Sequence, residues 1–146
     1  MLGITVRRGL PFRPDQLFEL VADVERYPEF VPWWAAARIT GRDGDTYQTD
    51  QVVRFGPLRR RFATETRLFR PTRIEVTSND RGFRQFHIGW RFEASPEGGC
   101  TVGLTITMEL SGRLAQDVSA AVLARAPERL VATFEARAHQ IYGTIR

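Results

Sequence analysis

The alternation of apolar and other residues between Phe83 and Leu110 limits the fold of this chain more than any other feature. "FRQFHIGWRF" (83–92) carries large apolar side chains at every second position from Phe86, and "VGLTITMEL" (102–110) repeats the pattern after the turn "SPEGG". A period of two predicts β-strands with one apolar face. The short turn predicts an antiparallel pair, and its apolar face must be covered by another element.

The remaining segments extend this pattern into a sheet with helices. Residues 4–6 predict a first strand, and Pro14 with the apolar stripe over residues 17–24 predicts a helix that ends or restarts at Pro28. Four further strands are expected between Pro32 and residue 76. Residues 114–142 have a helical composition. We therefore expect one α+β domain over residues 1–146: about seven antiparallel strands, one or two short helices after the first strand, and a long C-terminal helix.

The C-terminal segment carries two apolar stripes that a straight helix cannot turn toward the same sheet. One stripe contains Leu123, Leu130, Phe134 and Ile141, and the other contains Leu114, Val118 and Val122. Pro127 lacks an N–H group and crowds the preceding turn. We therefore expect a kink or break over residues 125–127, with the half that contains Phe134 packed on the sheet.

Composition and charge narrow the setting in which the protein works. Cys100 is the only cysteine, so no intramolecular disulfide is available and a reducing compartment fits best. No apolar run has the ~18 residues of a membrane span, and the start resembles a strand rather than a signal peptide. We expect a cytoplasmic, bacterial protein with peripheral contact at the inner membrane. The net charge is +4 and every basic residue is arginine, which reflects either composition bias or attraction to phosphate groups of lipid or RNA; no DNA partner is expected.

Residues with catalytic or metal-binding chemistry are few and scattered. His87 and His139 have no evident partner, and Cys100 follows a glycine-rich turn. Glu65 and Glu75 on predicted strands are either outer-face ion-pair partners or buried acids. No Cys/His spacing is typical of a metal site and no glycine-rich phosphate loop is present. We therefore predict no catalytic residue, no metal and no cofactor.

Arginines are densest in "PLRRRF" (57–62). Successive strand residues point to opposite faces, so one of Arg59, Arg60 and Arg61 should differ from the others in exposure. The cluster is either a surface that contacts membrane or RNA, or a charged edge that discourages aggregation.

The loop "YPEFVPWW" (27–34) is far more aromatic than a simple connection requires. Trp33 and Trp34 should point to opposite sides of an extended segment, one toward the interior and one outward. Together with the apolar face of the sheet, the loop predicts a pocket for a hydrophobic ligand between the sheet and the C-terminal helix.

Four stretches resemble a known family. They are "LVADVERYPEFVPW" (20–33), "VRFGPLRRRFATETRL" (53–68), "FRQFHIGWRF" (83–92) and "LVATFEARAHQIYG" (130–143). They are similar to the coenzyme Q-binding, START-like family of the polyketide cyclase/dehydrase and lipid-transport superfamily, which includes ribosome-association toxins. The resemblance implies the helix-grip fold, a hydrophobic tunnel, and a lid at residues 27–34. Trp34 and Ile88 depart from the family, which usually has cysteine and a small polar residue at these two positions.

The resemblance implies non-catalytic binding of ubiquinone or another polyisoprenoid, in support of its delivery to respiratory enzymes. The alternative is a toxin that binds the large ribosomal subunit and blocks subunit joining; an aromatase/cyclase is the third reading. The expected surface-contact residues are Arg59, Arg60 and Arg61. The expected ligand-binding residues are Val24, Tyr27, Pro28, Phe30, Val31, Trp33, Trp34, Phe55, Phe62, Phe86, Ile88, Trp90, Leu104, Ile106, Met108 and Phe134.

Overall fold

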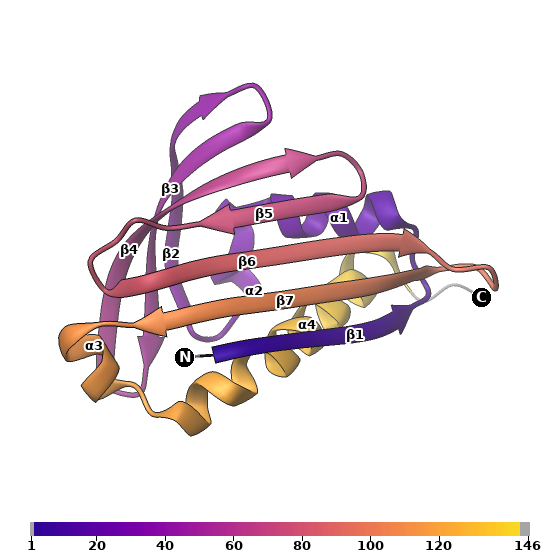
Figure 1. Ribbon diagram of the computed structural model, residues 1–146. Coiled ribbons are helices and arrows are strands. Elements are labelled where there is room, and N and C mark those ends of the chain that lie inside the picture. Colours follow the sequence, from indigo (N-terminus) through magenta and orange to yellow (C-terminus); the bar gives the residue numbers. More distant parts are fainter. Residues whose placement is uncertain (1, 144–146) are drawn as a thin grey trace.

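A computed structural model describes residues 2–143 of the chain as a curved sheet that holds a long helix (Figure 1). The elements are β1 (Leu2–Leu10), α1 (Pro14–Ala22), the 3₁₀ turn η1 (Val24–Arg26), α2 (Tyr27–Phe30), β2 (Trp34–Asp43), β3 (Thr46–Phe55), β4 (Leu58–Phe69), β5 (Arg73–Thr77), β6 (Phe83–Ala94), β7 (Cys100–Leu110), α3 (Gly112–Asp117) and α4 (Ala120–Tyr142).

The seven strands form one antiparallel sheet in the order β1-β7-β6-β5-β4-β3-β2. The register places Trp90 of β6 and Val6 of β1 on either side of Leu104 in β7, so the apolar positions of neighbouring strands share one face. In Figure 1 the sheet bends, with β2, β3 and β4 running steeply across the direction of β6 and β7, and α4 lies behind β1, β7 and β6. The predicted α+β helix-grip architecture is confirmed.

Helix α4 is attached to the rest of the molecule along its C-terminal two-thirds. Leu130, Val131, Phe134 and Ala138 are buried. Arg8 of β1 donates to Glu135 at 2.8 Å, and the Tyr142 hydroxyl donates to the carbonyl of Gln16 in α1 at 2.8 Å. Ile141 was expected in the same stripe but is 48% exposed.

The expected break near Pro127 is wrong in position. The helical segment is interrupted at Val118 and Ser119, where both residues have extended backbone angles. Ser119 caps α4, since its hydroxyl accepts the N–H of Val122 at 3.1 Å. Pro127 lies inside α4 and is buried, so the helix tolerates one missing hydrogen bond in exchange for a packed ring. The interruption lets α3 turn Leu114 and Val118 toward the interior.

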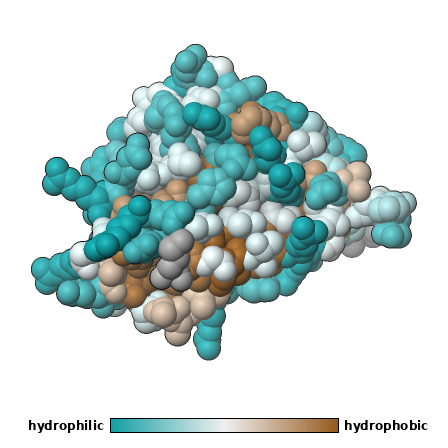
Figure 2. Space-filling view, in the orientation of Figure 1, coloured by the Kyte–Doolittle hydropathy of each residue, from teal (hydrophilic) through white to brown (hydrophobic). Residues whose placement is uncertain are grey.

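The first helix ends at Ala22, and a new helix begins at Tyr27, which agrees with the expected restart at Pro28. α1 stops at Ala22, η1 follows, and Pro28 lies in the first turn of the four-residue α2, where a proline costs no hydrogen bond. None of the helices within residues 2–143 combines the length and hydropathy needed to cross a bilayer. Hydrophilic residues cover most of the sheet face seen in Figure 2, and hydrophobic residues gather along β1 and α4.

Candidate ligand-binding site

Three hollows lie in series between the sheet, α3 and α4. The outermost is a surface groove of about 660 Å³, which has Pro32, Trp33 and Phe55 on one side and Val122 and Arg129 of α4 on the other. The next is a chamber of about 110 Å³, here called the outer chamber, and the third is an inner chamber of about 50 Å³. Groove and outer chamber share wall residues, as do the two chambers, so the hollows are consecutive. The residues common to groove and outer chamber are Trp33, Phe55, Val118 and Ala126.

The outer chamber is walled almost entirely by apolar side chains. Inward-facing positions of β3, β4, β6 and β7 supply one side, because alternate strand residues point to the same face. Rings pack closely there: Phe83 lies 4.8 Å from Phe86 and 5.8 Å from Phe62, centroid to centroid. α3 and α4 supply the other side. The lining residues are Trp33, Trp34, Val53, Phe55, Arg60, Phe62, Phe83, Phe86, Ile88, Ile106, Met108, Leu110, Leu114, Val118, Leu123, Ala126 and Leu130.

The inner chamber differs from the outer chamber by a buried polar wall. A partition made of Trp34, Phe62, Phe86, Ile88 and Leu130 separates the two. Beyond the partition, Gln51, Thr64 and Thr66 face the cavity among apolar and tyrosine side chains. Thr49, Gln51, Thr64 and Thr66 are all at least nine-tenths buried.

Three of these polar side chains are joined by hydrogen bonds; we call Thr49, Gln51 and Thr64 the triad. The hydroxyls of Thr49 and Thr64 bond to each other. The amide nitrogen of Gln51 donates to the hydroxyl of Thr49 at 2.8 Å and to that of Thr64 at 3.1 Å. The indole Nε1 of Trp34 donates to Oε1 of Gln51 at 2.8 Å. Buried polar groups are retained when they are bonded in this way.

Two tyrosines border the inner chamber as neutral phenols. Burial raises the pKa of Tyr47 to about 12, partly offset by a hydrogen bond with Thr66, and burial raises the pKa of Tyr27 well above its ordinary value. Tyr47 donates to the carbonyl of Ala22 at 2.8 Å, and Tyr27 donates to the carbonyl of Val21. Their hydroxyl hydrogens are therefore already used within the protein.

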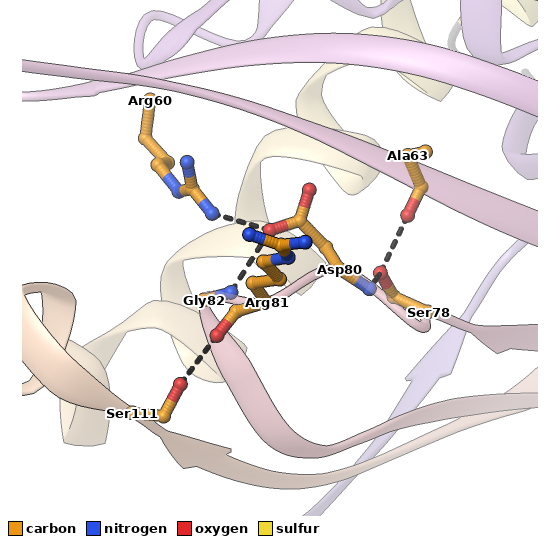
Figure 3. A network of polar contacts seen from close by, with 7 residues as sticks. All are labelled: Arg60, Ala63, Ser78, Asp80, Arg81, Gly82 and Ser111. Carbon is orange, nitrogen blue, oxygen red and sulfur yellow. Dashed lines mark hydrogen bonds and ion pairs between the residues drawn. The ribbon is translucent and has the colours of Figure 1, made fainter.

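Arg60 forms the far wall of the outer chamber and belongs to a polar network (Figure 3). Its guanidinium pairs with Asp80, whose carboxylate also accepts the N–H of Gly82 at 2.9 Å. Ser111, which precedes α3, donates to the carbonyl of Arg81. A Cβ at Gly82 would lie 2.6 Å from Nη2 of Arg60 and 2.9 Å from Cδ2 of Leu114. The absence of that Cβ lets Arg60 and α3 close the chamber together.

The other arginines of the cluster point outward. Arg60 has a side chain 33% exposed, whereas that of Arg61 is 69% exposed and pairs with Asp50. Arg59 is exposed and stands opposite Arg54 in the β3–β4 hairpin. Within residues 2–143 neither Arg54 nor Arg59 forms an ion pair. Since Arg54 lines the groove, the hairpin tip presents positive charge at its rim, where Asp117 is the acidic residue of the lining.

The structure separates the two tryptophans of the loop. The ring of Trp33 lies at the groove, with the guanidinium of Arg129 5.2 Å from its centroid. Trp34 lies in the partition between the chambers. The loop of residues 27–34 was expected to cover the entrance, but only Pro32 and Trp33 of this loop border the groove.

Most of the residues predicted from sequence lie in the chamber walls, but some do not. Phe134 packs against Tyr27, Phe30 and Trp90 at centroid distances of 5.2, 5.2 and 5.3 Å, and these rings fill the space that a ligand was expected to occupy. Leu104 is completely buried in the core. The predicted residues that line a chamber are Val24, Tyr27, Trp33, Trp34, Phe55, Phe62, Phe86, Ile88, Trp90, Ile106 and Met108. Those that line neither are Pro28, Phe30, Val31, Leu104 and Phe134.

Sequence reasoning missed the polar wall and the helical side of the outer chamber. Gln51 and Thr49 share the face of β3 that carries Val53, so parity alone would have turned them inward. The β3–β4 register pairs Thr64 with Thr49 and Thr66 with Tyr47, so both threonines point to the same side of the sheet as their partners. Leu114 and Val118 were placed in the stripe that does not pack on the sheet, because the interruption at Ser119 was not recognised.

The residues considered for catalysis lie elsewhere. His87 is hydrogen-bonded to Glu75 on the outer face of the sheet, a partner that the sequence did not make evident. Glu65 bonds to Gln48 at 3.2 Å, also outside. Cys100 is buried in the core, and burial raises the pKa of its thiol to about 11, so the thiolate is suppressed. His139 packs edge-on against Phe12 at 4.9 Å.

Comparison with known proteins agrees with this architecture. The family model described as "Polyketide cyclase / dehydrase and lipid transport" matches residues 10–135. The ribosome association toxin RatA of Pseudomonas aeruginosa is 33% identical over 134 residues, 92% of this chain and 93% of that protein. The mitochondrial coenzyme Q-binding protein COQ10 homolog B of Xenopus laevis is 25% identical over 138 residues, 92% of this chain and 57% of that protein.

A solved structure extends the likeness to three dimensions. The 18 kDa protein CC1736 of Caulobacter crescentus is 37% identical, with a TM-score of 0.77 over 99% of this chain and 100% of that one. The family model and each of these relatives cover most of the chain. The chain belongs to the polyketide cyclase/dehydrase and lipid transport family.

Proposed function

We propose that the protein binds one elongated hydrophobic molecule, a polyisoprenoid of the ubiquinone type, and holds it without changing it chemically. The observation that carries this proposal is the outer chamber: a cavity walled by aromatic and aliphatic side chains, with Arg60 as the single charged residue among the described residues of its lining, that lies next to a surface groove and shares wall residues with it. Apolar walls with few polar groups suit a lipid tail, whose burial contributes about 0.8 kcal/mol per CH₂.

Ligand entry requires the chamber walls to move. The outer and inner chambers, at about 110 and 50 Å³, are smaller than the roughly 300–1,000 Å³ typical of ligand pockets. The movable parts are the partition side chains and α3. Helix α3 has six residues, none of them buried, and the backbone is extended at both of its ends, at Ser111 and Val118. Outward movement of α3 would join both chambers to the groove.

A binding role without catalysis is supported by what the chambers contain. Within the described chain, neither chamber is lined by a histidine, an aspartate or a glutamate. General acid–base chemistry most often uses such a group within hydrogen-bond reach of its substrate. The hydroxyls of Tyr27 and Tyr47, which border the inner chamber, already donate to backbone carbonyls. Two relatives are named as a toxin and as a coenzyme Q-binding protein rather than as enzymes.

The groove is suited to exchange of the ligand with a membrane. Val122 is 45% exposed beside it. The groove lining contains Arg54 and Arg129, which have no ion-pair partner among residues 2–143, and one acidic residue, Asp117, which pairs with Arg113. Positive charge around an apolar opening favours the surface of an anionic bilayer. Delivery of the lipid to respiratory enzymes is the role that this arrangement would serve.

Titration with a short-chain ubiquinone tests the proposal. Binding in the chambers brings the quinone beside Trp34, which borders both of them, so the intrinsic fluorescence should be quenched with saturation at one equivalent. Trp34→Phe should remove most of the quenching, and Trp33→Phe should remove less because Trp33 lies at the groove. Quenching that does not saturate, or that survives unchanged in both variants, would contradict binding at this site.

Association with the large ribosomal subunit is the second candidate function. It is favoured by the 33% identity to a protein named as a ribosome association toxin and by the exposed arginines of the β3–β4 hairpin. Co-sedimentation with purified large subunits over a salt series tests it, since contacts with RNA phosphates weaken steeply as salt rises.

A further inference from the structure

The triad contains a hydrogen-bond donor that the protein does not use. An indole N–H is only a donor, so the bond from Trp34 orients the Gln51 amide with its oxygen toward the ring. The amide nitrogen of Gln51 then faces the threonines and donates one hydrogen to each of their hydroxyl oxygens. Thr49 and Thr64 share one hydrogen bond between them, although they hold two hydroxyl hydrogens.

The second hydroxyl hydrogen has no acceptor among the described residues. Thr64 lines the inner chamber, whereas Thr49 lies behind it. When Thr49 donates to Thr64, the Thr64 hydroxyl is therefore free to donate into the chamber. An unsatisfied buried donor favours a ligand that can accept a hydrogen bond at that point.

The surroundings of the triad restrict the chemistry of that acceptor. The described lining of the inner chamber contains no charged side chain, so a phosphate or carboxylate head group would be buried without a counter-charge at large cost. Both neighbouring tyrosines already donate to backbone carbonyls. A neutral carbonyl on a flat ring satisfies the free hydroxyl, and the aromatic rings of Trp34, Phe62 and Phe86 provide apolar faces for the ring.

We propose that the triad in the inner chamber recognises a carbonyl-bearing ring head group, so that the ligand enters head first and its apolar tail occupies the outer chamber and the groove. The proposal rests on the proposed function, because it assumes that a lipid enters the chambers. It adds the chemical class of the head group, a neutral quinone-type carbonyl rather than a prenyl phosphate, and the direction in which the molecule lies.

The test compares two probes that differ only in the head group. One is a short-chain ubiquinone, and the other carries the same prenyl tail on an unsubstituted benzene ring. Thr64→Val keeps the shape of the side chain and removes its donor. The ratio of the two affinities should fall about fivefold in this variant, the worth of one hydrogen bond, while the affinity for the benzene analogue stays constant. Thr77→Val, the same change at an exposed position of β5, should leave both affinities unchanged.

The outcomes separate this inference from the proposed function. If neither probe binds the wild-type protein, the proposed function fails and the inference with it. If both probes bind and Thr64→Val keeps the wild-type ratio, the triad is not the head-group site. If Arg60→Met removes the preference for the quinone instead, the head group lies in the outer chamber and the direction is reversed. A melting curve of each variant confirms that it is folded before its affinities are compared.

Discussion

The indole of Trp34 and the amide of Gln51 are hydrogen-bonded at 2.8 Å, which ties the start of β2 to the polar wall of the inner chamber. Trp34 is also part of the partition between the chambers. One side chain thus closes the cavity and orients the group that holds the threonines in place.

Trp34→Phe should destabilise the protein by leaving the Gln51 oxygen buried without its donor. The expected loss is roughly 1–3 kcal/mol in the free energy of unfolding, measured by urea denaturation. Gln51→Leu in the Trp34→Phe background should recover part of the loss, and a double-mutant cycle gives the coupling. Additive losses would show that the hydrogen bond does not contribute.

Phe134 and Phe86 should respond differently to the same substitution. Phe134 packs in a filled aromatic cluster, whereas Phe86 belongs to the partition. Phe134→Leu should lower the free energy of unfolding without changing the affinity for a short-chain ubiquinone, while Phe86→Leu should change the affinity. The more drastic Phe134→Ala should cost roughly 3–5 kcal/mol of stability. A reduced affinity for the quinone in the folded Phe134→Leu variant would show that Phe134 contacts the ligand.

The hairpin arginines should separate the two candidate functions. Arg59→Gln with Arg61→Gln should weaken binding to anionic vesicles by ~1 kcal/mol per arginine and leave quinone binding in detergent unchanged. Arg67→Gln with Arg91→Gln, at exposed positions away from the groove, serves as the control. Loss of ribosome co-sedimentation with unchanged vesicle binding would favour the second function. If neither assay changes, the hairpin arginines contact neither membrane nor RNA and serve only as a charged edge of the sheet.

Alkaline pH should destabilise the fold through Tyr47. Its pKa is raised by burial to about 12 in the folded state and is about 10 in the unfolded chain. Below pH 10 Tyr47 is protonated in both states, and its full contribution to the free energy of unfolding is present. Between pH 10 and 12 the unfolded state loses its proton first, so the free energy of unfolding falls as the pH rises, by up to about 1.4 kcal/mol per unit. Tyr47→Phe should show a shallower fall in the same urea titrations; an identical slope would exclude Tyr47 as its source.

The sheet could be predicted from sequence because period-two alternation in β6 and β7 determines which side chains share a face. Trp90, Ile88 and Ile106 were placed inward for that reason, and the register agrees. The C-terminal segment was harder to predict, because both a proline inside it and a capping serine can interrupt a helix. Pro127 was expected to break the helix, whereas the cap at Ser119 does so and leaves Pro127 packed inside α4.

The polar wall was not predicted because its meaning depends on three strands at once. Thr49 and Gln51 alone resemble surface residues of a strand. They become a network only when β4 places Thr64 opposite Thr49 and the irregular start of β2 brings Trp34 over Gln51. Phe134 shows the converse effect, since an apolar residue on the inner face of a helix is more often packed core than cavity wall, and only the positions of Tyr27 and Trp90 decide between them.

Native mass spectrometry of the purified, undenatured protein tests the central claim most directly. Ala126 of α4 lies between the groove and the outer chamber, so Ala126→Trp should block the path of the ligand while leaving the buried face of α4 intact. We expect one polyisoprenoid lipid per wild-type chain, identified after its release, and none on the folded variant. A folded wild-type protein that carries no lipid from its host, or a blocked variant that carries the same lipid in the same amount, would show that the chambers are not a lipid-binding site.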